Sequence, residues 1–96
     1  MAKKPVVKEA AVERELFDRV LDLGGACVKV RAIGHRGFFD RIIVLPGGRI
    51  IFVEVKRPRG GKWGPHQRQY ADLFLVLGAE VALVKKSEDI DALLKK

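Results

Sequence analysis

Residues 37–56 read GFFDRIIVLPGGRIIFVEVK, and this stretch decides the fold. Two apolar, β-branched runs flank a Pro-Gly-Gly segment, which predicts a β-hairpin whose three-residue loop places Gly48 in the left-handed conformation. With Leu45 opposite Arg49, counting back along both strands sets Asp40 opposite Glu54. Directly opposed residues of an antiparallel pair share one face, and Lys56 falls on that face too. The hairpin therefore predicts two carboxylates and one ammonium together at its open end.

This trio has two interpretations. Neighbouring carboxylates raise each other's pKa unless a cation lies between them, and oxygen ligands of this kind suit Mg²⁺ or Mn²⁺. The amine of Lys56 could then stabilise negative charge beside the ion. The same trio also fits an exposed salt-bridge cluster, which is common and contributes little to stability. A register slip of one residue would send Glu54 and Lys56 to the face opposite Asp40.

Composition narrows the class of protein. The chain has 96 residues, of which 48% are hydrophobic and 32% charged, so we expect one soluble domain over residues 1–96. The sequence has no internal repeat, no membrane-spanning run and no signal peptide. Its single cysteine, Cys27, cannot form an internal disulfide, so we expect it to be a small core residue of a protein in a reducing compartment. The net charge of +7 favours nucleic acid or another anionic partner, although solvated surface charge would give the same sum.

Hydrophobic periodicity predicts the elements around the hairpin. We expect a helix over 9–23, a strand over 26–30, a helix that begins at Pro65 and ends before Gly78, a strand over 80–85, and a short helix capped by Ser87. The expected inward stripes are Val12, Leu16, Val20 and Leu23 on the first helix, and Tyr70, Phe74 and Leu77 on the second. The order αβββαβα predicts an α/β or α+β sandwich around one mixed sheet, with the second hairpin strand in its centre.

Polar residues near these stripes, and two basic loops, supply further candidates. Glu13 lies at the edge of the first stripe, either as a snorkelling residue or as a third carboxylate of the pocket. Gln67 lies on the inward side of the second helix, as a satisfied core amide or as a support for the pocket. Basic and aromatic side chains that could contact DNA are Lys29, Arg31, His35, Arg36, Arg57, Arg59, Lys62 and Trp63. Trp63 could equally anchor its loop to the core.

The ordered set of features resembles the VRR-NUC family of the PD-(D/E)XK nuclease superfamily, in its short stand-alone phage and bacterial form. The likeness covers nearly the whole chain. It rests on an acid-bearing helix before Gly24-Gly25, the spacing from Asp40 to Glu54-Val55-Lys56, and Gln67 at the head of the next helix. The family usually has proline before the aspartate, where this chain has Phe39. We expect that departure to alter loop stiffness rather than to remove activity.

The resemblance implies a restriction-endonuclease-like fold and a DNA endonuclease that uses Mg²⁺ or Mn²⁺ and no organic cofactor. It assigns metal binding to Glu13, Asp40, Glu54 and the backbone carbonyl of Val55. Lys56 becomes the catalytic lysine, with Gln67 as an accessory residue. Stand-alone relatives resemble Holliday-junction resolvases, which implies a homodimer that acts on branched or four-way DNA. The expected location is the cytoplasm of a bacterial or phage-infected cell.

Two other functions fit the same residues. A non-catalytic basic module would bind DNA without metal, in a salt-sensitive manner, and would not cut it. A degenerate nuclease fold that serves as a protein scaffold would show no DNA affinity that depends on the basic loops. RNA is a weaker variant of the substrate, because no base-stacking pair is evident on a sheet face.

Overall fold

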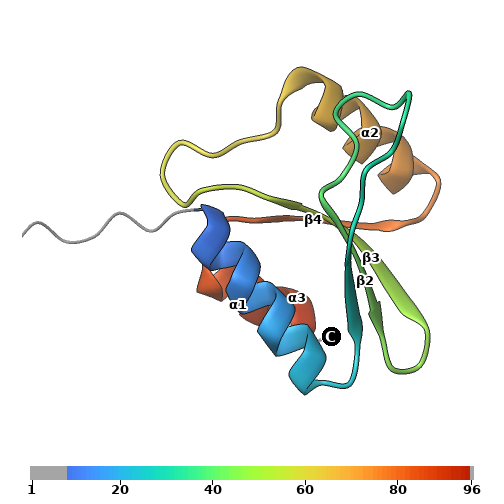
Figure 1. The fold of residues 1–96 in the computed structure, drawn as a ribbon. Coiled ribbons are helices and arrows are strands. Elements are labelled where there is room, and N and C mark those ends of the chain that lie inside the picture. The colour runs from blue at the N-terminus through green and yellow to red at the C-terminus, as the bar shows by residue number, and fades with distance from the viewer. Residues whose placement is uncertain (1–8, 96) are drawn as a thin grey trace, which may run out of the picture.

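The computed structural model describes residues 9–95, in the predicted order αβββαβα. The elements are α1 (Glu9–Asp22), β1 (Ala26–Lys29), β2 (Arg41–Leu45), β3 (Arg49–Val55), α2 (Pro65–Val76), β4 (Glu80–Val84) and α3 (Ser87–Leu94). The four strands form one sheet in the order β1-β2-β3-β4. The first three are antiparallel neighbours, whereas β4 runs parallel to β3. The mixed sheet is therefore confirmed, and β3 lies inside it (Figure 1).

The hairpin has the predicted register. Leu45 pairs with Arg49, and the ladder continues to Arg41 opposite Val53. The amide of Gly48 donates to the carbonyl of Leu45 at 3.0 Å, and Gly48 has φ +86°, which an L side chain rarely adopts. This turn fixes which hairpin residues face each side of the sheet.

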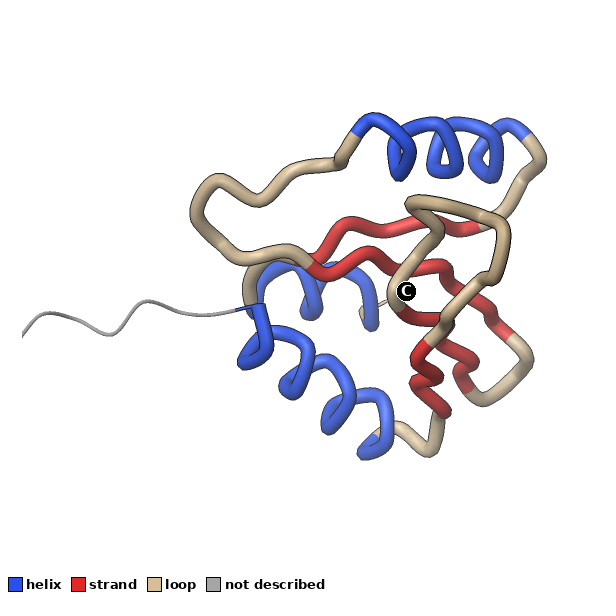
Figure 2. The backbone as a smooth tube through the Cα atoms, turned by 45° about the horizontal axis from the view of Figure 1, so that its top comes forward, coloured by secondary structure: helices blue, strands red, loops and turns tan. Residues whose placement is uncertain are grey.

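The two faces of the sheet are covered differently. Helices α1 and α3 lie together on one face and α2 lies across the other, as Figure 1 and Figure 2 show. The odd-numbered residues of β3, Ile51, Val53 and Val55, join the aliphatic core with Leu16 of α1 and Ile90 of α3. The even-numbered residues of β3 therefore face α2. Aromatic rings gather on that face and contact one another edge to face or tilted: Phe38, Phe39, Phe52, Trp63, Tyr70 and Phe74.

Three local predictions were wrong. Leu23 and Leu77 are 50% and 72% exposed, because each lies just after the last residue of its helix, where the chain turns away. Ser87 does not cap α3: the capping position is Lys86, and the hydroxyl of Ser87 instead donates to Glu15 at 2.6 Å. The short helix itself is confirmed, and it begins at Ser87, one residue earlier than a cap at Ser87 would give.

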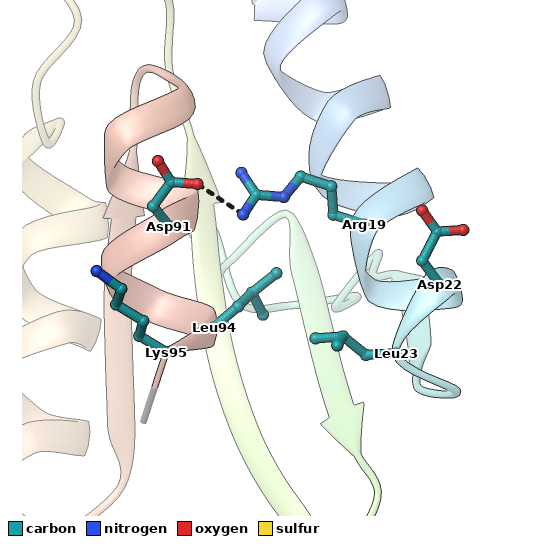
Figure 3. A pocket seen from close by; sticks show the side chains of 6 residues that line it. All are labelled: Arg19, Asp22, Leu23, Asp91, Leu94 and Lys95. Carbon is teal, nitrogen blue, oxygen red and sulfur yellow. Dashed lines mark ion pairs between the residues drawn. The ribbon is translucent and has the colours of Figure 1, made fainter.

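Helices α1 and α3 are held together by charge as well as by packing. Arg19 of α1 pairs with Asp91 of α3 at 2.6 Å and with Glu15 at 3.2 Å. Figure 3 shows the Arg19–Asp91 pair at the side of a hollow of about 460 Å³ between the C-terminal halves of the two helices. The hollow is lined by Arg19, Asp22, Leu23, Asp91, Leu94 and Lys95. It lies on the face of the sheet opposite α2.

Two further observations bear on the class of protein. Cys27 is buried and unbonded, and burial raises the pKa of its thiol, which agrees with the predicted core role. Among the helices of residues 9–95, none has both the length and the apolar character that a membrane span requires.

Candidate active site

The two hairpin acids and the lysine meet where β2 begins and β3 ends. Asp40 directly precedes β2, and its Oδ2 accepts a hydrogen bond of 3.2 Å from the backbone amide of Val55. The ammonium of Lys56 lies 3.0 Å from Oε2 of Glu54. The register thus gathers Asp40, Glu54 and Lys56 at one end of the sheet, as the turn geometry predicted. We call these three residues the acidic cluster.

Glu54 has the most unusual surroundings in this cluster. It is 1% exposed and is the one charged residue that is buried in the part of the chain the structure describes. The pKa of its carboxyl is raised to about 7: burial raises it most, the neighbouring Lys56 ammonium lowers it, and the nearby carboxylate of Asp40 raises it again. The Oε1 atom is fully buried and finds no hydrogen-bond partner among residues 9–95. A buried carboxylate oxygen without a hydrogen-bond partner destabilises the folded protein, and a bound cation or proton at this atom would remove that cost.

Gln67 holds Glu54 from the head of α2. Its Oε1 accepts from the amide of Gly64 at 2.9 Å, half of a capping box across the start of the helix. Because this carbonyl oxygen faces a donor, the NH₂ group must point the other way, and it donates to Oε2 of Glu54. The helix cap therefore fixes which end of the amide meets the carboxylate. These two hydrogen bonds satisfy the amide and also place it against Glu54, so they fit both predicted interpretations, and a role for Gln67 in catalysis stays a prediction.

Glu13 does not join the acidic cluster in this structure. Its Oε1 pairs with Nε of Arg41 at 2.9 Å, and α1 packs on the face of the sheet opposite α2. Glu13 is at the edge of the apolar stripe, as expected, with 22% of its side chain exposed. Asp40 and Arg41 point to opposite sides of the strand, so a helix on the side of Arg41 brings Glu13 to Arg41 and not to Asp40. The sequence pattern does not show which face of the sheet α1 covers. Metal binding by Glu13 stays a prediction.

The basic candidates lie on two loops and on the edge strand β1. Seven of them are exposed: Lys29, Arg31, His35, Arg36, Arg57, Arg59 and Lys62. Trp63 is half-buried and packs edge-on against Phe39 with ring centroids 6.2 Å apart, so it anchors its loop. This contact favours the anchoring interpretation, and a DNA contact by Trp63 stays a prediction. Phe39, which stands where the family usually has proline, is only 2% exposed. Its buried ring therefore holds the backbone in place directly before Asp40.

The chain is similar to known proteins in both sequence and structure. No protein-family model matches the chain. It is 41% identical over 90 residues to a protein of Acyrthosiphon pisum secondary endosymbiont phage 1 named "Putative nuclease p44", a match that covers 93% of this chain and 94% of that protein. A solved structure described as "VRR_NUC domain" superposes with a TM-score of 0.87 at 35% identity, covering 93% of this chain and 96% of the other. The chain belongs to the VRR-NUC family. The resemblance that the sequence predicted is thereby confirmed.

Two glycines of this VRR-NUC chain, neither of them among the predicted site residues, shape the site. Gly64 supplies the amide that orients Gln67, and the spacing of three residues between them is the N-cap to N3 spacing that could have indicated it. Gly61 is buried against the strand end that carries Lys56. A Cβ at Gly61 would lie 2.3 Å from the carbonyl oxygen of Arg57 and 2.7 Å from Cβ of Lys56. No spacing rule identifies such a close approach.

We expect Gly61→Ala to displace Lys56. Both clashing neighbours are close to the backbone and cannot simply rotate away, so overpacking should cost about 1–3 kcal/mol of stability. Thermal unfolding and cleavage rate would be measured together. The matched control is Gly60→Ala, which is strained by its φ of +76° but has nothing closer than 3.8 Å around its new methyl group. If the two variants lost stability and activity in the same proportion, the close packing on Lys56 would be irrelevant to the site.

Proposed function

We propose that this VRR-NUC chain is a Mg²⁺- or Mn²⁺-dependent endonuclease that hydrolyses DNA phosphodiester bonds. The observation that carries this proposal is the buried Oε1 of Glu54, which lies beside Asp40 and Lys56 and has no hydrogen-bond partner within residues 9–95. A salt-bridge cluster kept only for solubility would be exposed and would leave no buried carboxylate oxygen without a donor. The family supports the same function, because its relatives carry nuclease names.

The residues present fit a hard divalent cation. Within residues 9–95, no set of three or more His, Cys, Asp or Glu side chains is gathered as a ready metal site. Mg²⁺ does not need one, since it is commonly held by one or two carboxylates together with waters and substrate phosphates. Asp40 and Glu54 would hold the ion, with the carbonyl of Val55, and Glu13 remains a proposed further ligand. When bound, the ion supplies Lewis acidity toward a phosphoryl oxygen.

The chain's own groups would do the remaining work. The exposed cations of loops 31–36 and 57–62 hold the DNA backbone by charge. Gln67 keeps the Glu54 carboxylate oriented. The Lys56 ammonium, which is 24% exposed beside Glu54, donates to the attacking water or to a phosphoryl oxygen as negative charge develops. Water attacks phosphorus, the bond between phosphorus and the 3′ oxygen breaks, and the proton that the water loses ends on the leaving 3′ oxygen, which gives a 5′ phosphate and a 3′ hydroxyl.

Preference for branched or four-way DNA, and a homodimer, belong to this proposal as well. Two symmetric copies of a site that cuts one strand can cut two strands. At the C-terminal end of α2 and just beyond it, exposed apolar side chains that a second copy could cover are Leu75, Val76 and Leu77. Light scattering during gel filtration would give twice 10.7 kDa for such a dimer, whereas a monomer would remove that part of the proposal.

The proposal is tested by one set of cleavage reactions. Linear, flapped and four-way DNA are incubated with Mg²⁺, Mn²⁺ or EDTA, and wild type is compared with Asp40→Ala. We expect cleavage with either metal, fastest on branched DNA, none with EDTA, and a loss of at least about a hundredfold in Asp40→Ala. Binding without cleavage under every condition would favour the non-catalytic module. No affinity for any DNA would favour the scaffold.

A further inference from the structure

A second hollow lies between the loop that precedes β2 and one side of α2. Its volume is about 370 Å³, and its lining consists of Arg36, His66, Gln69, Tyr70 and Leu73. Arg36 comes from the loop and the other four come from α2, where Figure 1 shows the two segments near each other. Apart from Arg36, these residues were not among the DNA-binding candidates from the sequence.

Helix α2 links the hollow to the acidic cluster, because His66 lines the hollow and the next residue, Gln67, contacts Glu54. Loop and helix are in close contact at Gly37, where a Cβ would lie 2.5 Å from Cβ of His66 and 3.0 Å from the amide nitrogen of Gln67. Gln67 in turn donates to Glu54. Successive residues of a helix point about 100° apart, so His66 and Gln67 face neighbouring but separate sites. A ligand in the hollow would therefore lie beside the carboxylates and not between them.

Tyr70 gives the hollow a fixed aromatic ring. Its hydroxyl lies 3.0 Å from Nδ1 of His35, and its ring packs edge to face on Phe38 with centroids 5.4 Å apart. The residue is half-buried, so part of the ring remains accessible. A ring that is already held in one orientation loses little conformational entropy when a base stacks on it.

The other lining groups complement the remaining parts of a nucleotide. Arg36 is exposed, and in the part of the chain the structure describes it takes part in no ion pair, so its guanidinium is available to a phosphate. The amide of Gln69 offers donors and an acceptor to a base edge, and Leu73 offers apolar surface. In a duplex each base is already stacked and paired, so its faces cannot reach such a hollow.

We propose that this hollow binds one unpaired nucleotide of the DNA substrate, with its base on Tyr70 and its phosphate on Arg36, next to the bond that the acidic cluster cuts. The inference rests on the proposed nuclease function and deepens it. It supplies a reason for selectivity toward DNA that has a single-stranded segment beside a duplex.

The test measures binding with EDTA present, so that it does not depend on cleavage. Two DNAs are compared: a duplex with a single-stranded arm, and the same sequence fully paired, with 2-aminopurine at the junction position. We expect the armed DNA to bind more tightly, and its 2-aminopurine fluorescence to be quenched by stacking. Arg36→Ala and Tyr70→Leu should each weaken binding of the armed DNA about tenfold, with little change for the paired DNA. Tyr70→Phe should retain the quenching.

Arg68→Ala is the matched control. Arg68 is an exposed cation on α2 that pairs with Asp72 at 3.1 Å and does not line the hollow. Gln69→Ala, which is exposed and outside the aromatic contacts, repeats the test if Tyr70→Leu fails to fold. Equal losses on both DNAs, or unchanged quenching in Tyr70→Leu, would overturn the inference even where the wild type cleaves DNA. If selective binding is found but no metal supports cleavage, the nuclease proposal fails and the nucleotide site stands.

Discussion

Glu54→Gln should abolish cleavage and at the same time make the metal-free protein more stable at pH 8. Glutamine keeps the shape and can still accept from Gln67, but it has no negative charge with which to hold a cation. The stability gain follows from linkage. The folded-state pKa of Glu54 is about 7, raised from an ordinary value of 4.5, so folding above that pH forces a buried charge. Removing this charge should stabilise the protein on the order of 2 kcal/mol, or roughly 10 °C.

The pH dependence distinguishes this explanation from a general effect of the substitution. Below about pH 4.5 the carboxyl is neutral in both folded and unfolded chains, so Glu54→Gln should gain nothing there. The gain should grow as pH rises from 4.5 to 7 and stay constant above it. Asp18→Asn, at an exposed acid of α1, should show no such trend. Mg²⁺ should raise the unfolding temperature of wild type and not that of Glu54→Gln. A gain that is independent of pH would contradict the assigned cause.

The hairpin is the part of the site that local sequence rules predict best. The Pro-Gly-Gly loop has few conformations, and the alternation of side chains follows from the backbone, so one turn type fixed both the register and the convergence of Asp40 with Glu54. The inward position of Gln67 followed in the same way from helical spacing. Each of these inferences needs only the geometry of one or two elements.

The predictions that did not hold depended on how elements pack. Periodicity assigned Leu23 and Leu77 to buried stripes, but a periodic pattern does not show where the helix ends, and both lie just beyond it. Glu13 lies at the predicted edge of its stripe and its metal binding stays a prediction, but the pattern could not show that α1 would cover the face opposite Glu54, where Glu13 meets Arg41. The closeness of Gly61 to Lys56 arises only when the loop folds back. These features are set by tertiary contacts that a single element does not encode.

Lys56→Ala should lower cleavage by about a hundred- to a thousandfold, for two separable reasons. The ammonium lies 3.0 Å from Glu54 and opposes the rise of its pKa, so removing it should raise that pKa above about 7 and move metal binding to higher pH. The ammonium should also stabilise charge on the phosphate as the bond breaks. Cleavage would be followed from pH 6 to 9 at saturating Mg²⁺, with metal binding measured separately by the unfolding temperature.

The two roles separate at alkaline pH. If Lys56 served only to keep Glu54 charged, Lys56→Ala would recover wild-type activity near pH 9, where the carboxyl is ionised without help. We expect metal binding to recover there while cleavage stays low, because the compact donor to the phosphate is still missing. Lys56→Arg is the matched control: it keeps a positive charge beside Glu54, so its metal binding should follow the wild-type pH curve. Its cleavage should nevertheless fall, since a planar guanidinium cannot take the place of a point-like ammonium. If the cleavage rate of Lys56→Ala recovered fully at pH 9, the role of Lys56 would be limited to keeping Glu54 charged. Other groups would then have to stabilise the negative charge that develops on the phosphate.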